Sequence, residues 1–384
     1  MTTEAPKLLI QAYLEADGTM ADLVSSYTIK ARRHGKYENL VLLKYGIEAA
    51  FMNPMVRECR GIILDEAKGW AIVSRAFDKF GNEGEGYVPE IDWSTARVQE
   101  KLDGSLCVLY HYDGAWHVAT SGSPDASGEV RQAGMRDGLV EASGMTFAAY
   151  FWETFKASGG TLPEPSDLCF AFELMGPLNR IVVVHEKPWL RLLAVRNRVT
   201  GEQFLPDDMA AVVGIPAVQS FPLGTIEEIH ASFEHISPVS QEGYVVVDGA
   251  FNRVKIKHPG YVALHHAKDG MGPKAFVEIA RTGEVSEVLS AFPEFRPLIE
   301  EARAKYTALV QAVKASYAPI KDAENQKAFA LEALKTPYSA ALFQMRKGVE
   351  LEQFFRDVAV DKLMGWMGIE ATDDSSASAE SKEK

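Results

Sequence analysis

The sequence predicts an α+β protein, in which a domain of antiparallel sheets is followed by an all-α C-terminal domain. In the first part of the chain, apolar runs of strand length alternate with turn signals such as Asp113-Gly114 and Asp248-Gly249. In the last third, apolar residues recur every three to four positions, which is typical of helices that bury one face. We therefore predict a domain at residues 1–258, a helical domain at 259–370 and a Ser-rich tail at 371–384 that we expect to be disordered.

Composition limits the class of protein. Hydrophobic residues make up 47% and charged residues 24% of the 384 residues, as in ordinary globular proteins. No apolar run approaches the roughly 20 residues that a membrane span needs, and no signal peptide is recognisable, so we expect a cytoplasmic monomer without a membrane partner. Cys59, Cys107 and Cys169 show neither disulfide nor metal-ligand spacing. The net charge of -13 means that a nucleic-acid partner needs a local basic site.

The elements of the first domain are expected in a regular order. Residues 8–33 predict two short helices, 37–45 a strand, and 146–156 a helix after a hairpin closed by Asp113-Gly114. The other expected strands all have apolar runs bounded by turn residues, and they are residues 57–65, 70–77, 105–112, 115–121, 168–175, 179–184, 189–196, 242–247 and 253–258.

The stretch Glu100-Lys101-Leu102-Asp103-Gly104-Ser105 places a lysine beside a tight turn between two predicted strands. Lys101 is the candidate nucleophile. A lysine amine attacks only when it is neutral, so its pKa of about 10.4 must be depressed by burial or by a second cation. Gly104 suits a turn with positive φ and lets a ligand approach closely. Taken alone, Lys-x-Asp-Gly is equally a common exposed hairpin signal.

Further charged residues stand at the ends of predicted strands. Arg60 and Lys79 flank the second strand pair, where two cations can converge on a polyphosphate or remain solvated rim charges. Glu173 is the one carboxylate in an apolar strand, so it is either hydrogen-bonded in the core or presented to a ligand hydroxyl.

The last predicted hairpin carries the clearest pattern. Lys255 and Lys257 share one face of a strand because side chains alternate with period 2, and like charges so placed favour an anion between them. A solvated lysine face is the alternative. Glu242, at the opposite end of the hairpin, is suited to hold a divalent cation through water. His265-His266 lack a third ligand at suitable spacing, so we expect surface histidines rather than a metal site.

Four motifs in this order resemble those of the covalent nucleotidyltransferases, which include the ATP-dependent ligases and the mRNA capping enzymes. They are Lys101-Leu102-Asp103-Gly104, Phe172-Glu173, Glu242-Gly243 and Lys255-Ile256-Lys257. Within that superfamily the chain resembles the phage-type RNA ligases, exemplified by the tRNA-repair ligase of T-even phages. Glu58-Cys59-Arg60-Gly61-Ile62 and Lys79-Phe80-Gly81-Asn82 carry this closer match. The resemblance implies an antiparallel-sheet nucleotidyltransferase domain, similar to the ATP-grasp ligases.

The resemblance also implies roles for the matching positions. Lys101 would form lysyl-AMP, assisted by the catalytic residues Lys255 and Lys257, and Glu242 would hold Mg2+ or Mn2+. The residues implied in ATP binding are Tyr45, Arg60, Lys79, Glu100, Lys101, Gly104, Glu173, Glu242, Lys255 and Lys257. The chain departs from the family at Gly81, where a second phenylalanine is usual, and at Ser121, where a basic residue is usual.

We therefore expect an ATP-dependent RNA ligase that joins 5′-phosphate and 3′-hydroxyl ends of single-stranded RNA, with nicked tRNA as one such substrate. The steps would be formation of lysyl-AMP, transfer of AMP to the RNA 5′-phosphate, and displacement of AMP by the 3′-hydroxyl. Three alternatives share part of the pattern: a DNA ligase, a GTP-dependent capping guanylyltransferase, and a non-catalytic protein that binds RNA ends.

Overall fold

The computed structural model describes residues 7–16, 18–46, 48–130, 143–164, 167–283, 285, 288–289 and 292–369. The described residues form two compact units, the first reaching to His265 and the second starting at His266. The expected tail at 371–384 lies outside the described residues. No helix among the described residues is both long and apolar enough to cross a membrane.

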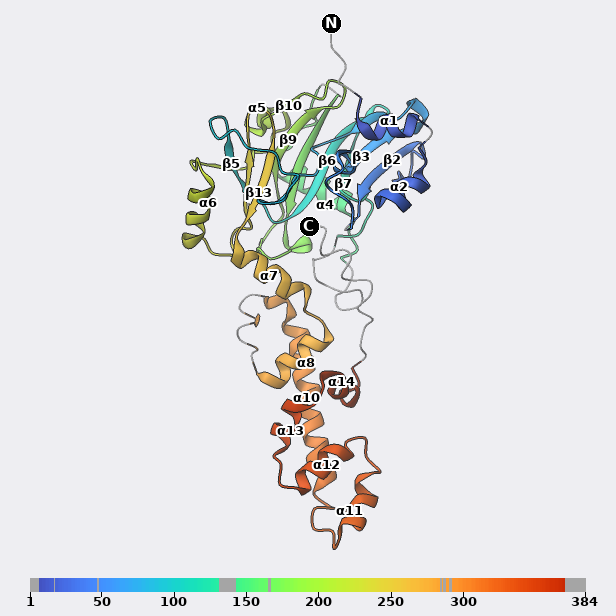
Figure 1. Cartoon of the computed structure of the whole chain (residues 1–384), viewed down its shortest axis with the longest axis vertical. Helices are drawn as coiled ribbons and strands as arrows, with labels where there is room; N and C mark the ends of the chain where they lie inside the picture. Colours follow the sequence, from blue (N-terminus) through green and yellow to red (C-terminus); the bar gives the residue numbers. More distant parts are fainter. Residues whose placement is uncertain are drawn as a thin grey trace. The chain divides into compact units, whose positions relative to one another are not determined.

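Thirteen described strands form three sheets of the first unit, and all pairs of neighbouring strands within them are antiparallel (Figure 1). This confirms the predicted α+β class with antiparallel sheets. The first sheet has the order β1-β2-β3-β4, and its strands are β1 (Ile29–Arg33), β2 (Leu40–Tyr45), β3 (Arg60–Asp65) and β4 (Ala71–Ser74). Its helices are α1 (Leu9–Glu15), α2 (Met20–Tyr27) and α3 (Pro54–Glu58), with the short η1 (Glu66–Lys68) between β3 and β4.

The second sheet has the order β10-β9-β8-β6-β7. Its strands are β6 (Ser105–Tyr112), β7 (Ala115–Thr120), β8 (Leu168–Met175), β9 (Trp189–Asn197) and β10 (Gln203–Phe204). The associated helices are α4 (Phe147–Ala157), η2 (Pro177–Asn179) and α5 (Pro206–Val213). Asp113 and Gly114 both have positive φ, 50° and 75°, as a two-residue hairpin turn requires.

The third sheet has the order β11-β5-β12-β13, so β12 lies between the strand that ends at Lys101 and the strand that carries Lys255 and Lys257. Its strands are β5 (Arg97–Lys101), β11 (Ser220–Phe221), β12 (Gly243–Val247) and β13 (Arg253–Lys257). One face packs on α6 (Ile226–Ser232) and η3 (Phe233–His235) through Tyr244, Val246 and Ile256. The alternating residues of β5 and β13, among them all three lysines, therefore point to the other face.

Apolar side chains join the sheets and their helices. The inner face of the first sheet packs against the second sheet, where Leu42 and Ile63 share a buried cluster with Val108 and Ala171. The opposite face of the second sheet is covered by aromatic residues of α4, including Phe151. Because β8 is central in its sheet and buried on both faces, its sequence reads as a continuous apolar run interrupted only by Glu173.

The described part of the second unit is helical. Helix α7 spans the boundary between the two units. The core of the second unit is formed by side chains such as Val277, Phe329, Leu342 and Phe355. The described elements are α7 (Pro259–Asp269), α8 (Pro273–Thr282), η4 (Pro293–Phe295), α10 (Arg296–Tyr317), α11 (Gln326–Ala333), α12 (Ser339–Arg346), α13 (Leu351–Asp357) and α14 (Val360–Met367). The domain division expected at residue 258 stays a prediction.

Several element predictions were wrong. The N-terminal helices end at Tyr27, and Ile29–Arg33 is an edge strand that pairs with β2. Residues 57–58 belong to α3 because Asn53 caps this helix and Pro54 starts it. Residues 180–184 form no strand, since the backbone amides of Val182 and Val183 bond to a side chain instead. In the last third of the chain, the three-to-four spacing over residues 338–367 corresponds to three helices, with Gly348 at a φ of 84° after the first.

Candidate active site

The strand register brings two of the predicted catalytic lysines to the same place. Gly243 on β12 lies opposite Lys101 on β5 and opposite Lys257 on β13. Neighbouring strands are about 4.8 Å apart, so the two lysines stand two strand spacings apart on one face with a glycine between them. The structure thus joins residues that are far apart in the sequence, as the motif order predicted.

Glu242 lies between these two lysines. Its Oε2 is 2.7 Å from the Lys101 amine and its Oε1 is 2.9 Å from the Lys257 amine, and the carboxylate is almost fully buried. Burial alone would raise the pKa of Glu242, but the two ammonium groups lower it below its usual value. Glu242 is therefore ionised and holds the candidate nucleophile in an ion pair.

Two glycines let the chain pass closely through this region. Gly243 has a φ of 149°, and a Cβ there would lie 2.2 Å from the Ile256 carbonyl oxygen. A Cβ at Gly104 would lie 2.5 Å from the Leu174 carbonyl oxygen and 3.1 Å from Glu173 Cγ. The positive φ expected at Gly104 is absent, so this glycine is needed for close packing of the nucleophile turn against β8 rather than for its backbone angle.

The other motif lysine, Lys255, is crowded by cations. Burial, together with the charges of Lys79, Lys101, Lys257 and Arg60, lowers its pKa to about 6. Burial and the neighbouring Arg60 also lower the pKa of Lys79. The guanidinium of Arg60 lies 4.7 Å from the centre of the Phe77 ring and 5.1 Å from that of Phe80. This half-buried set of like charges is suited to bind a polyphosphate.

Glu173 lies on β8 close to the same cations. Burial raises its pKa to about 7, while Lys101 and Arg60 lower it and the charge of Glu242 raises it. A carboxyl group with this pKa can donate or accept a hydrogen bond near neutral pH. The position is consistent with the ligand-hydroxyl alternative stated for Glu173, and that role stays a prediction.

The segment Lys79-Phe80-Gly81-Asn82 runs along the outer edge of β13. The Lys255 amide donates to the Gly81 carbonyl at 3.0 Å, and the Glu83 amide donates to the Lys255 carbonyl at 3.0 Å. This pairing places the Lys79 motif beside the Lys255 motif. Gly81 has a local explanation, because a Cβ there would lie 2.5 Å from Val88 Cγ2 and 3.0 Å from Tyr87 Cζ.

Ser121 lies at the end of β7 against the Arg60 motif. A Cβ on Gly61 would lie 3.1 Å from the Ser121 carbonyl oxygen, and Gly61 has a φ of 78°, which favours glycine. Lys44 is opposite Arg60 in the register of β2 and β3, and its side chain lies beside Gly122. A cation from the first sheet therefore stands next to the position where the family usually has a basic residue.

Tyr45 and Glu100, which are also predicted to bind ATP, have surroundings that differ from those of the lysines. Tyr45 is buried against Phe51, and the Lys79 amine lies 5.8 Å from its ring centre. Glu100 precedes Lys101 in the strand and points to the opposite side, where burial raises its pKa and Arg191 lowers it. Contact of either residue with ATP stays a prediction.

The sequence did not reveal the structural role of Asp103 or any role for Tyr261. The buried Asp103 carboxylate accepts hydrogen bonds from the backbone amides of Val182 at 2.8 Å and Val183 at 2.6 Å, and from the Tyr261 hydroxyl at 2.6 Å. Asp103 therefore ties the turn after Lys101 to a loop and to α7. The Lys-x-Asp-Gly pattern pointed to a turn, but no sequence signal identified these distant partners.

Gln99 was also missed. It lies two residues before Lys101 on the same face, and its register partner Val245 pairs in turn with Lys255. The side chain is buried, and its amide nitrogen Nε2 has no hydrogen-bond partner among the described residues. A buried amide beside the cations can bind a polar ligand group, because such groups are otherwise costly to bury.

A metal ion fits Glu242 only as a single carboxylate ligand. No three His, Cys, Asp or Glu side chains in the described ranges are grouped to hold a metal. Magnesium commonly keeps several waters and takes one or two carboxylates together with substrate phosphates. Each carboxylate oxygen of Glu242 contacts one lysine amine. Glu242 is suited to bind a metal once Lys101 or Lys257 moves away and frees one of these oxygens.

The comparison with protein families identifies the chain. Residues 58–261, more than half of the sequence, match a family described as RNA ligase. The chain belongs to the RNA ligase family. An RNA ligase of Rhodothermus phage RM378 is 27% identical over 339 residues, which cover 73% of this chain and 76% of the relative. The family predicted from the motif residues, and RNA as its substrate class, are thereby confirmed.

A second relative is a nuclear polyhedrosis virus protein of Autographa californica, described as a polynucleotide kinase/RNA ligase. It is 28% identical over 77% of this chain and 44% of the relative. Among solved structures, an archaeal ATP-dependent RNA ligase has 13% identity and a TM-score of 0.41 over 78% of this chain and 74% of that chain. A Naegleria gruberi RNA ligase with ATP and Mn has 14% identity and a TM-score of 0.30 over 46% and 52%. These scores are too low to assign the fold, which rests on the sheets described above.

The two motif lysines should affect stability in opposite directions. Because the pKa of Lys255 falls from 10.5 to about 6 on folding, the unfolded chain binds more protons at this residue between those pH values. We expect Lys255→Met to raise the melting temperature by a few degrees at pH 7, since about 1 kcal/mol shifts a domain of this size by roughly 2–4 °C. The gain should shrink as the pH rises towards 10.5.

Lys257→Met, its matched control two residues away, removes one partner of the buried Glu242 and should lower the melting temperature at pH 7. Thermal melts across this pH range distinguish the two substitutions. Equal effects of both would mean that the two lysines occupy the same electrostatic environment.

Proposed function

We propose that this RNA ligase uses ATP and forms a covalent lysyl-AMP at Lys101. The observation that carries the proposal is the convergence of Lys101, Lys255 and Lys257 on one face of the third sheet, with Glu242 between two of them. Glu173 approaches the same cations from β8 of the second sheet. In the first step the Lys101 amine bonds to the α-phosphorus of ATP, the bond to the β-phosphate oxygen breaks, and pyrophosphate leaves. The amine must lose its proton before it attacks.

The surrounding cations have the chemistry that phosphoryl transfer needs. Little covalent assistance is required beyond the nucleophile, so most of the catalysis comes from positioning and from neutralising charge on the phosphate oxygens. We assign the α-phosphate to Lys255 and Lys257, and the departing pyrophosphate to Arg60 and Lys79. Mg2+ or Mn2+ would neutralise the phosphates and bind through Glu242.

The acceptor groups follow from the same chemistry. The AMP on Lys101 passes to an RNA 5′-phosphate, and a 3′-hydroxyl then displaces AMP to form the phosphodiester bond. We propose single-stranded RNA ends, among them those of a nicked tRNA, and a monomeric enzyme. In a chain with a net charge of -13, a local group of cations around Lys101 suits binding of RNA ends better than a clamp around duplex DNA.

Gln99 adds a reason to prefer ATP over GTP. A buried glutamine amide can bond to the edge of adenine through both its donor and its acceptor, as glutamines do when they read adenine in nucleic acids. Its free Nε2 lies on the face that carries Lys101. The GTP-dependent capping guanylyltransferase is therefore the less favoured alternative.

Incubation with labelled ATP and a divalent cation should attach AMP to the protein through an acid-labile, alkali-stable bond. Lys101→Ala should remove the label entirely, because no other lysine lies in the position of the nucleophile. Denaturing electrophoresis measures the label, and Lys68→Ala, an exposed lysine of η1, is the control that should label normally. Labelling from GTP in preference to ATP would mean capping chemistry, and full labelling of Lys101→Ala would exclude this nucleophile.

The substrate prediction compares two acceptors at equal enzyme and salt. Single-stranded RNA with a 5′-phosphate and a 3′-hydroxyl should be joined at least about tenfold faster than a nicked DNA duplex is sealed, which corresponds to about 1.4 kcal/mol in transition-state stabilisation. Gel electrophoresis of end-labelled strands measures both products. Faster sealing of the nicked DNA would leave the role of Lys101 intact but contradict the choice of acceptor.

A further inference from the structure

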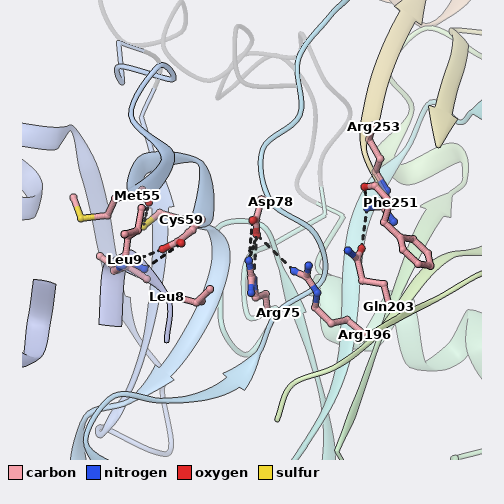
Figure 2. A network of polar contacts seen from close by, with 12 residues as sticks. Leu8, Leu9, Met55, Cys59, Arg75, Asp78, Arg196, Gln203, Phe251 and Arg253 are labelled. Carbon is pink, nitrogen blue, oxygen red and sulfur yellow. Dashed lines mark hydrogen bonds and ion pairs between the residues drawn. The ribbon is translucent and has the colours of Figure 1, made fainter. Parts of the chain in front are cut away.

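A second group of buried cations lies beyond the catalytic lysines. Arg253 precedes Lys255 by two residues on β13, so both side chains point to the same face of the sheet. Arg196 comes from the end of β9, and Arg75 and Asp78 come from the segment after β4. Figure 2 shows Arg75 and Arg196 both reaching towards Asp78, with Arg253 farther along beside Gln203 and Phe251. We call Arg75, Asp78, Arg196 and Arg253 the arginine cluster.

The single carboxylate of the arginine cluster is largely committed to one partner. Arg75 Nε and Nη2 donate to Asp78 Oδ1 at 3.0 and 2.8 Å, and Nη2 also donates to Oδ2 at 2.8 Å (Figure 2). Arg196 Nη1 is 3.6 Å from Asp78 Oδ1, which is close enough for attraction but too long for a hydrogen bond. Asp78 therefore neutralises mainly Arg75 and is shared with Arg196 only through this longer ion pair.

Arg196 is the unsatisfied member of the cluster. The residue is only 9% exposed, and its Nε and Nη1 have no hydrogen-bond partner in the part of the chain that the structure describes. Burial and the charge of Arg75 lower its pKa to about 10. A buried guanidinium with unused donors is costly, and an oxygen of a phosphate or carboxylate is the charged acceptor that suits such a donor best.

Arg253 adds a second buried charge beside it. Its Nη1 donates to the Gln203 side-chain oxygen at 2.9 Å and to the Phe251 carbonyl at 3.0 Å, both neutral acceptors (Figure 2). Burial and the neighbouring Arg196 lower its pKa to about 9. The cluster thus holds three guanidinium groups and the carboxylate of Asp78, with weaker attractions of Arg253 to Asp248 and of Arg75 to Glu58.

The cluster is continuous with the catalytic pocket. The Phe77 ring is contacted by the guanidinium of Arg60 at 4.7 Å from its centre and by that of Arg253 at 5.3 Å. Arg60 in turn lies close enough to Lys255 and Glu173 to shift the pKa of both. The positive charge therefore extends from the nucleophile through Arg60 to the arginine cluster without leaving the protein interior.

A purely structural network is the main alternative. Buried arginines often brace neighbouring segments, and Arg75 with Asp78 has the geometry of such a brace. Water would satisfy the donors of Arg196, but it would not neutralise the excess of positive charge. An anion does both, and Asp78, whose side chain is 37% exposed, marks the side from which an anion reaches the cluster.

We propose that Arg196 and Arg253, together with Arg75, form a second phosphate-binding site next to the catalytic pocket. The assignment of its source rests on the proposed function: the phosphate belongs either to the RNA 5′ end or to the outer phosphates of ATP. Both have the same oxygen chemistry. In this site Asp78 competes with the phosphate for the guanidinium groups, so its removal strengthens anion binding.

The first test is a thermal melt with inorganic phosphate or pyrophosphate, compared with chloride at equal ionic strength. Phosphate should stabilise the protein by mass action. Asp78→Asn should lower the melting temperature in chloride but enlarge the phosphate-induced rise, and Arg196→Met should reduce that rise. Arg198→Met is the matched control. Arg198 lies directly after the end of β9, two residues from Arg196, but its guanidinium donates to Asp167 and to the Ile72 carbonyl. Its phosphate-induced rise should equal that of the wild-type protein.

The second test separates the two sources with Arg196→Met. A rise of about tenfold in the ATP concentration for half-maximal self-labelling would assign the site to the outer phosphates of ATP. Unchanged self-labelling with about tenfold slower transfer of AMP to 5′-phosphorylated RNA would assign it to the RNA end. Both outcomes support the site.

The proposal is overturned if Asp78→Asn and Arg196→Met keep the phosphate-induced rise of the wild-type protein and Arg196→Met keeps both reaction rates. The cluster is then a structural brace. Failure of the proposed function looks different, because the wild-type protein would not label itself with any nucleotide, whatever the melts in phosphate show.

Discussion

The ion pair of Glu242 with Lys101 and Lys257 is the interaction on which the site depends. One buried carboxylate joins two strands across a glycine, at 2.7 and 2.9 Å. Removing either lysine leaves a buried charge with one partner, which typically costs more than the pair contributes when intact. In the mechanism proposed above, attack by Lys101 requires rearrangement around Glu242, because both oxygens of this carboxylate contact lysine amines.

The unfavourable free energy of burying positive charge in the site comes mainly from the cations that form no ion pair with Glu242. Lys255 has the low pKa of about 6 because it is buried beside Lys79, Lys101 and Lys257. Burying Lys255 lowers the free energy of unfolding, and packing elsewhere in the core must compensate for this loss. In the proposed mechanism an anion bound beside Lys255 would favour its charged form, so part of the binding free energy would come from relief of repulsion. Protonation of Lys255 and anion binding are consequently linked.

The catalytic strands were predictable because their chemistry follows a local rule. Period 2 placed Lys255 and Lys257 on one face, and turn residues placed the ends of β6, β7 and β8 within one or two residues. The partners of Asp103 were not predictable, since Val182 and Tyr261 are 79 and 158 residues away in the sequence. The same long-range bonds turned the apolar run at 180–184 into a loop. The sequence led us to expect a lowered pKa for a lysine of the site, but it could not show which lysine the folded chain buries. The structure gives the lowered pKa for Lys255.

Asp103 shows how a motif residue outside the reaction can still control it. Its carboxylate joins the turn after Lys101 to Val182, Val183 and Tyr261, with three hydrogen bonds between 2.6 and 2.8 Å. Gly104 then fits against β8 with no room for a Cβ. The position of the nucleophile is therefore fixed from the side of the turn by Asp103 and from the side of the sheet by Glu242. Because the first constraint is independent of ligand and the second is not, substrate binding can release the amine of Lys101 while its backbone remains in place.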